Sequence, residues 1–464
     1  MTSAVLPTRL RDEARAFLQL AIPLASAQVA QAMTGFVDTV MMGWLGQTAL
    51  ASGGLAAMVF LSFLVVSTGV VSSVSPLVAE AYGAQQPLRV GLVARQGSWL
   101  AVLLTVPQFP IMGHLDGVMV RLGQDPAVVA QMTTYLDIIR WGLLPALLFA
   151  VLRGVVSSLS QARAIMVIVV VANLLNVVWN YIFAFGKLGL PAMGLAGLAL
   201  ASAIAHWLMF LALLGYILWR RVDKFSAYRF FDQLHRVDLR MLRRLTGLGW
   251  PIGVATLLEQ GLFLVMTLFM GALGTSFLAA HQLALQTVTV IFMVPLAMSN
   301  TATIRVGQWF GRRDWAGIRR AAIASTGCTA AFMALTMVLL LVFPRVIIGF
   351  YIDVNDPSNA DLIQAGVALL MVAGYGQVLD GVQRTLNGVL HGLQDTRAPM
   401  VIGTLGYWGV GMTTSYWLGF HTPLAGVGVW LGSYVGLAVA AIALLWRFST
   451  LMPRKECRGE RGTG

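Results

Sequence analysis

Apolar stretches of about 20 residues or more follow one another along almost the whole chain, separated by short polar breaks. Stretches of this length match helices that cross the hydrocarbon core of a bilayer. They are too long for the strands of a membrane barrel. The pattern therefore predicts an all-α polytopic membrane protein with twelve transmembrane helices, at residues 17–43, 50–79, 92–113, 128–157, 162–186, 192–219, 247–271, 277–304, 317–349, 361–391, 398–420 and 424–448.

The second half of the sequence repeats the first at an offset of 228 residues, so that Pro23 falls on Pro251 and Gly46 on Gly274. Six helices per repeat keep both halves in the same orientation, which predicts two six-helix lobes related by a pseudo-twofold axis along the membrane normal. The predicted domains are an N-terminal lobe, a basic cytoplasmic linker, a C-terminal lobe and a cytoplasmic tail, at residues 1–219, 220–246, 247–448 and 449–464.

Charged residues are few and unevenly placed. The chain is 58% hydrophobic and 11% charged, too few charges to cover the surface of a soluble protein. The formal net charge is +12, and most of the 31 Lys and Arg lie in the breaks on one side of the predicted helices. The positive-inside rule assigns that side, with both termini, to the cytoplasm of a protein in the cell inner membrane. The basic balance thus reflects topology and does not indicate nucleic-acid binding.

Three acids, Asp38, Glu259 and Asp380, lie inside predicted membrane helices. A charged residue at a helix centre costs about 2.5–3.5 kcal/mol on insertion scales, so such residues usually have a function. None of the three has an acid at the matching position of the other repeat. Carboxylates that exchange a proton or a sodium ion are what an ion-driven transporter needs, which makes these acids the leading candidates for its chemistry.

Polar side chains accompany Asp38 at helical spacing. Gln31 lies on the same face of the first predicted helix, and Asn173, Asn176 and Asn180 share one face of the fifth. Asparagine can hydrogen-bond a carboxyl group or bind sodium through its carbonyl oxygen. The alternative for these amides is ordinary pairing between helices.

The second half carries its own polar set. Arg384 follows Asp380 by one helical turn, so an ordinary ion pair between them is an alternative to a functional Asp380. Neither His281 nor any other His has a partner at metal-ligand spacing, and no nucleotide-binding or nucleophile motif is present. We therefore predict no enzyme activity and no cofactor. Possible cavity residues are Phe263, His281, Gln282, Phe292, Gln377 and Arg384.

Several segments resemble the MATE (multidrug and toxic compound extrusion) transporters, in their NorM-like bacterial branch. They are QVAQAMTGFVDTVMMGWLG, PLVAEAYGA, NLLNVVWNYIFAFGKLGLPAMGLAG, LLEQGLFLVMTLFMGALG and VLDGVQRTLNGVLHGLQDTRAPM. The resemblance implies two lobes that open alternately inward and outward. It also implies export of bulky, often cationic drugs and dyes, driven by inward flow of protons or sodium. We expect these small molecules and membrane lipids as partners of a monomer.

The resemblance also assigns residues. A first-lobe protonation network would comprise Asp38, Gln31, Tyr135, Asn176 and Asn180, and a second-lobe cation site would contain Glu259 and Asp380. Some relatives place a tyrosine one turn before the second acid, where this chain has Gly376. That departure counts against sodium, so protons are favoured.

Two other functions are alternatives to efflux. A flippase for lipid-linked precursors, from the wider superfamily, should present Arg or Lys to a pyrophosphate, and Arg384 is the only candidate here. An intramembrane enzyme would need a nucleophile-base pair or a metal motif, and the sequence shows neither.

Overall fold

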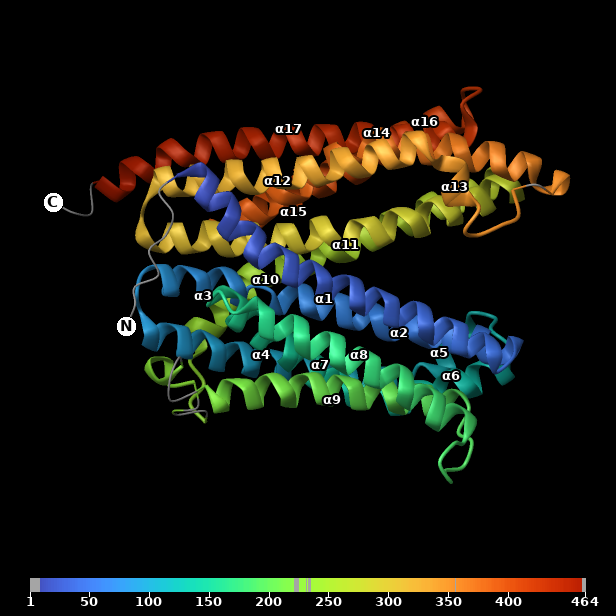
Figure 1. The fold of residues 1–464 in the computed structure, drawn as a ribbon, viewed down its shortest axis with the longest axis horizontal. Coiled ribbons are helices and arrows are strands. Elements are labelled where there is room, and N and C mark those ends of the chain that lie inside the picture. Colours follow the sequence, from blue (N-terminus) through green and yellow to red (C-terminus); the bar gives the residue numbers. More distant parts are fainter. Residues whose placement is uncertain (1–8, 221–224, 231, 233–234, 355, 461–464) are drawn as a thin grey trace. The chain divides into compact units, whose positions relative to one another are not determined.

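The computed structural model describes residues 9–220, 225–230, 232, 235–354 and 356–460, and all regular elements within them are helical (Figure 1). Eleven of these helical spans are long and apolar enough to cross a membrane, which confirms the predicted all-α polytopic fold. The longer elements are α1 (Leu10–Trp44), α2 (Gln47–Val71), α4 (Pro87–Met112), α6 (Pro126–Ile139), α7 (Leu143–Ser158), α8 (Ala162–Phe185), α9 (Leu195–Trp219), α10 (Leu239–Leu273), α11 (Thr275–Arg312), α12 (Trp315–Val342), α14 (Ala360–Gly392) and α17 (Ala425–Glu460).

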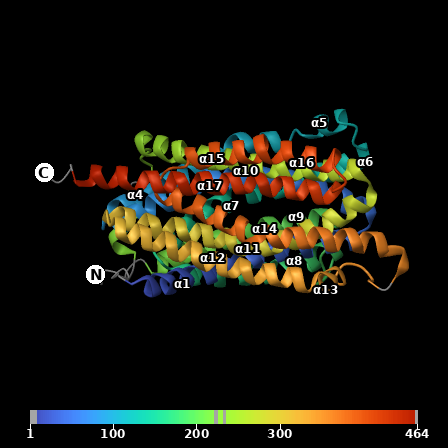
Figure 2. The ribbon, with the colours of Figure 1, turned by 90° about the horizontal axis from the view of Figure 1, so that it is seen from above.

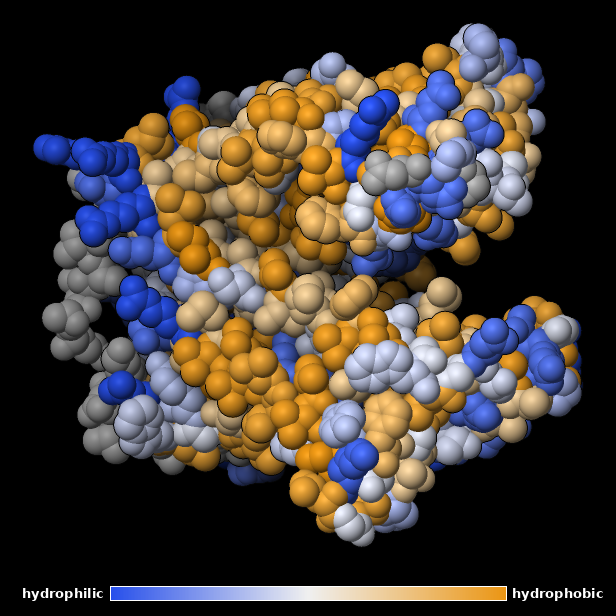
Figure 3. All heavy atoms as spheres, turned by 45° about the vertical axis from the view of Figure 1, so that its right-hand side comes forward, coloured by the Kyte–Doolittle hydropathy of each residue, from blue (hydrophilic) through white to orange (hydrophobic). Residues whose placement is uncertain are grey.

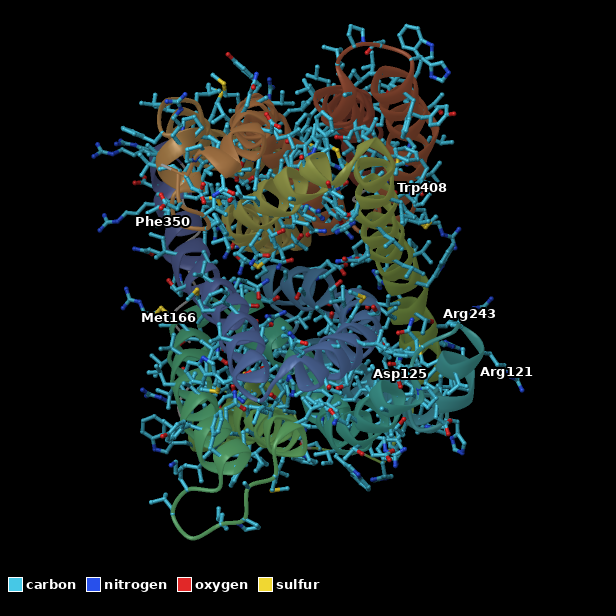
Figure 4. All side chains as sticks on the ribbon, turned by 90° about the vertical axis from the view of Figure 1, so that its right-hand side faces the viewer. Arg121, Asp125, Met166, Arg243, Phe350 and Trp408 are labelled. Carbon is cyan, nitrogen blue, oxygen red and sulfur yellow. The ribbon has the colours of Figure 1, made fainter. Side chains whose placement is uncertain are left out.

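Shorter helices join or extend these spans: α3 (Val74–Gly83), α5 (Asp116–Arg121), η1 (Arg140–Gly142), η2 (Ser226–Tyr228), α13 (Pro344–Ile348) and η3 (Pro357–Asn359). Figure 4 shows Arg121 and Asp125 at the turn between α5 and α6. On the face shown in Figure 3, hydrophobic residues cover most of the helix sides, whereas hydrophilic residues gather at the helix ends. This is the distribution that a membrane-spanning helix requires.

The predicted crossing at residues 398–420 is divided into three pieces, which explains why eleven single helices meet the length criterion. They are α15 (Arg397–Thr404), the π-helix η4 (Leu405–Gly411) and α16 (Met412–Phe420). Figure 2 shows them lying along α17. Glycines permit this approach, because a Cβ on Gly406 would lie 2.9 Å from the Cβ of Ala440. Single π-helical turns inside α-helices often occur at functional sites.

The largest differences from the predicted helix starts are at α1, which begins at Leu10 and not at residue 17, and at α10, which begins at Leu239 and not at residue 247. The additional turns carry charged residues such as Glu13 and Arg244. Hydropathy marks only the part of a helix that lies in hydrocarbon, so it leaves out charged turns that continue beyond it.

The chain forms two compact units. Unit 1 contains Met1–Ala25 and Val254–Gly464, and unit 2 contains Ser26–Gly253. The two divisions fall inside α1 and α10, each two residues after a proline, Pro23 or Pro251. The division into four domains remains a prediction. Within the predicted linker, residues 221–224, 231, 233 and 234 lie outside the described residues.

The first turns of α1 belong to the core of unit 1. Phe17, 1% exposed, packs in one cluster with Val306 of α11, Leu390 of α14 and Leu444 of α17. Figure 1 shows the first turn of α1 and the last turns of α17 at the same end of this unit. A helix that starts in unit 1 therefore continues as the first helix of unit 2.

A buried ion pair fixes the start of α1 to α11. Glu13 is 0% and Arg305 4% exposed. The Arg305 Nε and Nη2 atoms each donate to a Glu13 carboxylate oxygen at 2.7 Å, and Trp309 Nε1 donates to Glu13 Oε2 at 3.2 Å. Arg305 Nη1 donates to Gln308 Oε1 at 2.9 Å. Bidentate pairing of this kind is strong and geometrically specific.

Unit 2 holds the start of α10 in an analogous way, with the charges reversed. Glu80 of α3 accepts hydrogen bonds from Arg89 Nη2 at 2.8 Å and from Arg244 Nη2 of α10 at 3.4 Å. The offset of 228 residues places Glu80 on Gln308, which lies next to the buried pair of unit 1. Each unit thus secures the first turns of a crossing helix, one through an acid on that helix and the other through an arginine.

The described part of the linker docks on α4. A Cβ on Gly91 would lie 1.9 Å from the carbonyl oxygen of Tyr228, so only glycine permits this approach. Arg95 Nη1 donates to the Arg229 carbonyl at 2.9 Å, and Gln96 Nε2 donates to the Arg236 carbonyl at 2.9 Å. Burial raises the pKa of Tyr228 to about 12, so its hydroxyl stays neutral.

Candidate ion-coupling sites

Asp38 lies in unit 2, half-buried, with an asparagine bound directly to it. Asn180 Nδ2 of α8 donates to Asp38 Oδ1 at 2.5 Å and also to Asn176 Oδ1 at 3.2 Å. Asn176 and Asn180 are 1% and 0% exposed. The structure therefore brings together the acid and two of the amides, which the helical spacing had placed on one face of the first and of the fifth predicted helix.

Several amide atoms around this acid are buried without a hydrogen-bond partner in the described part of the chain. They are Asn173 Nδ2, Asn176 Nδ2 and Asn180 Oδ1. Buried polar atoms are normally satisfied, so exceptions of this kind often mark functional sites. An ionised Asp38 accepts from Asn180 Nδ2, and a protonated Asp38 would need an acceptor such as Asn180 Oδ1. One asparagine thus offers a partner to either protonation state.

Two further residues complete the surroundings of Asp38. Tyr135 of α6, 4% exposed, lies close enough to interact with it electrostatically. Ser202 Oγ of α9 donates to Asp38 Oδ2 at 3.5 Å. Ser202 could not be found from the sequence, because a single serine in an apolar helix carries no signal that separates function from packing.

The amides near the start of the stripe are arranged differently. Gln31 has no hydrogen bond to any residue that the structure describes, although it shares a helix with Asp38. Gln28 Oε1 accepts from Arg153 Nη1 of α7 at 3.2 Å. Only part of the predicted network is therefore directly bonded.

In unit 1, Arg384 pairs with Glu259 and not with its neighbour on the same helix. The Arg384 Nη2 atom of α14 donates to Glu259 Oε1 of α10, and the two side chains are 16% and 20% exposed. Asp380 makes no ion pair or hydrogen bond among the described residues. It still interacts electrostatically with both Arg384 and Glu259. The alternative of an ordinary Asp380–Arg384 pair is thus replaced by a pair between helices.

Aromatic and hydroxyl groups hold Arg384 in place. Its guanidinium carbon lies 4.6 Å from the centroid of the Phe292 ring, and its carbonyl oxygen accepts from Ser299 Oγ at 2.8 Å. Trp408 of η4, labelled in Figure 4, donates through Nε1 to the Leu258 carbonyl at 3.1 Å. Residues of α10, α11, α14 and the π-helix η4 therefore surround Arg384.

Two tyrosines lie near Asp380 that the sequence analysis did not single out. Tyr407 of η4 interacts electrostatically with Glu259, Arg384 and Asp380, and Tyr434 of α17 interacts with Asp380. The hydroxyl of Tyr434 lies 3.5 Å from the Ala373 carbonyl oxygen. Both residues are far from Asp380 in sequence, so no local spacing could have indicated them.

Gly376 makes room for Tyr434. A Cβ at residue 376 would lie 2.0 Å from Tyr434 Cε1, so the ring must move in Gly376→Ala. Overpacking of this kind typically costs about 1–3 kcal/mol. We expect the variant to unfold at a lower temperature in detergent and to transport less. In the control, Gly327→Ala, a Cβ meets no atom within 4 Å. Equal melting temperatures for both variants would contradict the proposed packing.

The other predicted cavity residues form no hydrogen bond or ion pair with Glu259, Asp380 or Arg384 within the described part of the chain. His281, 0% exposed, accepts through Nδ1 from Trp430 Nε1 at 3.1 Å, and its Nε2 lies 3.1 Å from Thr267 Oγ1. Gln282 next to it is exposed. Phe263 is 37% and Gln377 1% exposed, and Gln377 Oε1 has no partner in the described structure. His281 is thus held in the core by two hydrogen bonds.

Within the described residues, no group of three or more His, Cys, Asp or Glu side chains is arranged to hold a metal ion. The acids instead form two separate polar sites, one in each unit. Each site combines a carboxylate with amide or hydroxyl groups, which can exchange a proton or bind a monovalent cation.

Comparison with known proteins gives consistent matches. A family model described as MatE matches residues 23–182 and 251–417. The chain is 54% identical over 456 residues to the probable multidrug resistance protein NorM of Synechocystis sp., covering 98% of each chain. It is 37% identical over 447 residues to the multidrug resistance protein NorM of Burkholderia vietnamiensis, covering 96% of each.

Solved structures match the fold. A MATE protein in the straight conformation gives a TM-score of 0.86 at 19% identity, covering 95% of this chain and 97% of that one. An outward-facing multidrug resistance MATE family transporter gives 0.84 at 20% identity, covering 95% and 96%. At these identities the likeness shows the architecture.

Proposed function

The chain belongs to the MatE family, in its bacterial NorM-like branch, and from this we propose that it is a secondary active multidrug efflux antiporter. Its substrates would be lipophilic, often cationic drugs and dyes, exchanged for inward protons or sodium by alternating access. The observation that carries the proposal is Asp38, an intramembrane acid held by Asn180 among amides that still lack partners. The relatives named as multidrug resistance proteins supply the substrate class.

Charge exchange gives a physical route for coupling. An ionised acid within a unit attracts a lipophilic cation, and binding of the coupling ion neutralises that acid and weakens the attraction. A charge that moves inward through 100 mV of membrane potential gains about 2.3 kcal/mol. That free energy adds to the pH gradient whenever the exchange moves net positive charge inward.

Protons are our proposed coupling ion, with sodium as the alternative. The proton proposal rests on Asp38, whose amide neighbours suit both protonation states. Sodium would need several oxygen ligands at once. The Glu259 carboxylate is already engaged by Arg384, which leaves Asp380 with the hydroxyls of Tyr407 and Tyr434 as the oxygen set for a cation.

The test is dye efflux from proteoliposomes at fixed membrane potential. With sodium absent from both sides, we expect a pH gradient alone to drive efflux. Efflux that requires an inward sodium gradient and ignores pH would reject the proton assignment. In that case, Asp380, Tyr407 and Tyr434 are the first sodium ligands to test.

Topology and assembly are also proposals. The positive-inside distribution supports an inner-membrane location with both termini in the cytoplasm. We propose that the protein works as a monomer, since each unit contains its own complete polar site. The flippase alternative loses support, because Arg384 is paired with Glu259 and stacked on Phe292.

A double-variant experiment tests the site of unit 1. Glu259→Gln removes the partner of Arg384, and Asp380→Asn removes the second charge that acts on it. We expect each change to impair efflux and the double change to be less than additive, because the three residues are coupled. Efflux rates in proteoliposomes give the measurement.

The control for these variants is Asp361→Asn, an exposed acid in the first turn of α14. It should transport like the unaltered protein. Fully additive losses for Glu259→Gln and Asp380→Asn would mean that the two acids serve separate tasks.

A further inference from the structure

A groove of about 560 Å³ opens between α8 and α9, at the end where α8 begins and α9 finishes. At 1.5 Å per residue, Arg163 lies about 25 Å along α8 from Asn180. The groove is therefore separate from the Asp38 site, although the same two helices form both. Its lining residues are Arg163, Ala164, Val167, Ile168, Ala212, Gly215, Tyr216 and Trp219.

The walls of the groove are apolar, and small residues keep it open. A Cβ on Gly215 would meet no atom within 4 Å, and two other lining residues are alanines, Ala164 and Ala212. Val167 is 55% and Trp219 72% exposed. An open apolar groove of this kind on the outside of a membrane helix pair suits an acyl chain.

The polar end of the groove carries unusual charge. Arg163 is exposed and makes no hydrogen bond or ion pair with any residue that the structure describes. The guanidinium carbon of Arg220 lies 4.5 Å from the centroid of the Trp219 ring, so a second cation stacks on one of the lining residues. The Tyr216 hydroxyl lies 3.4 Å from Gln161 Oε1. The rim thus combines the guanidinium group of Arg163 with the amphipathic aromatic residues Tyr216 and Trp219.

We propose that this groove binds an anionic phospholipid, with the phosphate at Arg163 and an acyl chain along Val167, Ile168 and Gly215. Guanidinium groups recognise phosphate through paired hydrogen bonds. Trp219 suits the headgroup level, where tryptophan is enriched. Basic pockets between transmembrane helices on the cytoplasmic side bind acidic headgroups. The inference rests on the proposed topology, which places this rim at the inner leaflet.

Occupation of the groove has a structural consequence for the transporter. The lipid would bridge α8 and α9, which carry Asn180 and Ser202 at their other ends. Bound lipid is therefore expected to stabilise the two helices that position Asp38. The transport chemistry itself needs no lipid atom.

Native mass spectrometry of the purified full-length protein tests the proposal. Phosphatidylglycerol and phosphatidylcholine would be titrated separately, and the fraction that retains one lipid gives each dissociation constant. We expect tighter binding of phosphatidylglycerol, and about fivefold weaker binding in Arg163→Gln, since one basic residue near the surface is worth about 1 kcal/mol. Arg243→Gln, which removes another exposed arginine of unit 2 (Figure 4), should bind like the unaltered protein.

A second variant tests the groove without changing its charge. In Gly215→Phe the ring would fill the space beside α8, so we expect loss of phosphatidylglycerol binding while the melting temperature without added lipid stays unchanged. Equal affinity for both lipids, or unchanged phosphatidylglycerol binding in Arg163→Gln and Gly215→Phe, would overturn the proposal. Inorganic phosphate should not compete, because it lacks the acyl chain.

Discussion

Asp38→Asn is expected to abolish drug efflux while the folded protein still reaches the membrane. The amide keeps the shape of the side chain, and removes the one charge that Asn180 and Ser202 surround. Loss of the titratable group should eliminate coupling and not merely weaken binding. Resistance to a cationic drug in cells and dye efflux in proteoliposomes measure the effect.

The matched control is Asp137→Asn in the same unit. Asp137 is 45% exposed and pairs with Arg140 one turn away, a surface contact worth little. The Asp137→Asn variant should therefore retain full efflux. Normal efflux by a well-expressed Asp38→Asn protein would rule out the proposed role of Asp38 in coupling.

Glu13→Gln is expected to be the most destabilising single change outside the polar sites. Breaking a buried ion pair by removing one partner costs about 3–5 kcal/mol, because the other charge stays buried. Here Arg305 would remain 4% exposed against a neutral amide. Thermal unfolding of the purified protein in detergent should show a clear fall in the melting temperature.

A double variant separates the charge from the packing. Glu13→Gln combined with Arg305→Met removes both charges, and should be more stable than Glu13→Gln alone. Asp137→Asn, which breaks the exposed pair with Arg140, should change the melting temperature little. If Glu13→Gln has the same melting temperature as the unaltered protein, the ion pair contributes no net stability.

The apolar pattern was sufficient to predict the helices, because membrane thickness fixes their length. It could not predict their charged extensions or the π-helix at Leu405–Gly411, which depends on close packing against α17. Helical spacing placed Asp38 and Asn180 each on a polar face of its own helix, and the structure shows that the two side chains meet. Spacing also suggested an Asp380–Arg384 ion pair. In the structure, Arg384 pairs with Glu259 of another helix.

The failures share a physical cause. Spacing along one helix reports which residues share a face, and says nothing about what another helix brings to that face. Ser202, Tyr407 and Tyr434 reach the acids from such other helices. Glu13 lies outside the apolar stretch of its own helix, so the local sequence could not predict its burial against Arg305.

The division within α1 has a consequence for biosynthesis. Glu13 and Arg305 are 292 residues apart in the chain, and translation at about 5–20 residues per second separates them by roughly 15 to 60 s. Unit 2 is one continuous stretch, Ser26–Gly253, and Arg244 can meet Glu80 as soon as α10 is made. Unit 1 must wait, because its first piece is synthesised before everything else in it. Unit 2 can therefore fold before unit 1. The N-terminal residues, which are synthesised first, are among the last to reach their packing partners.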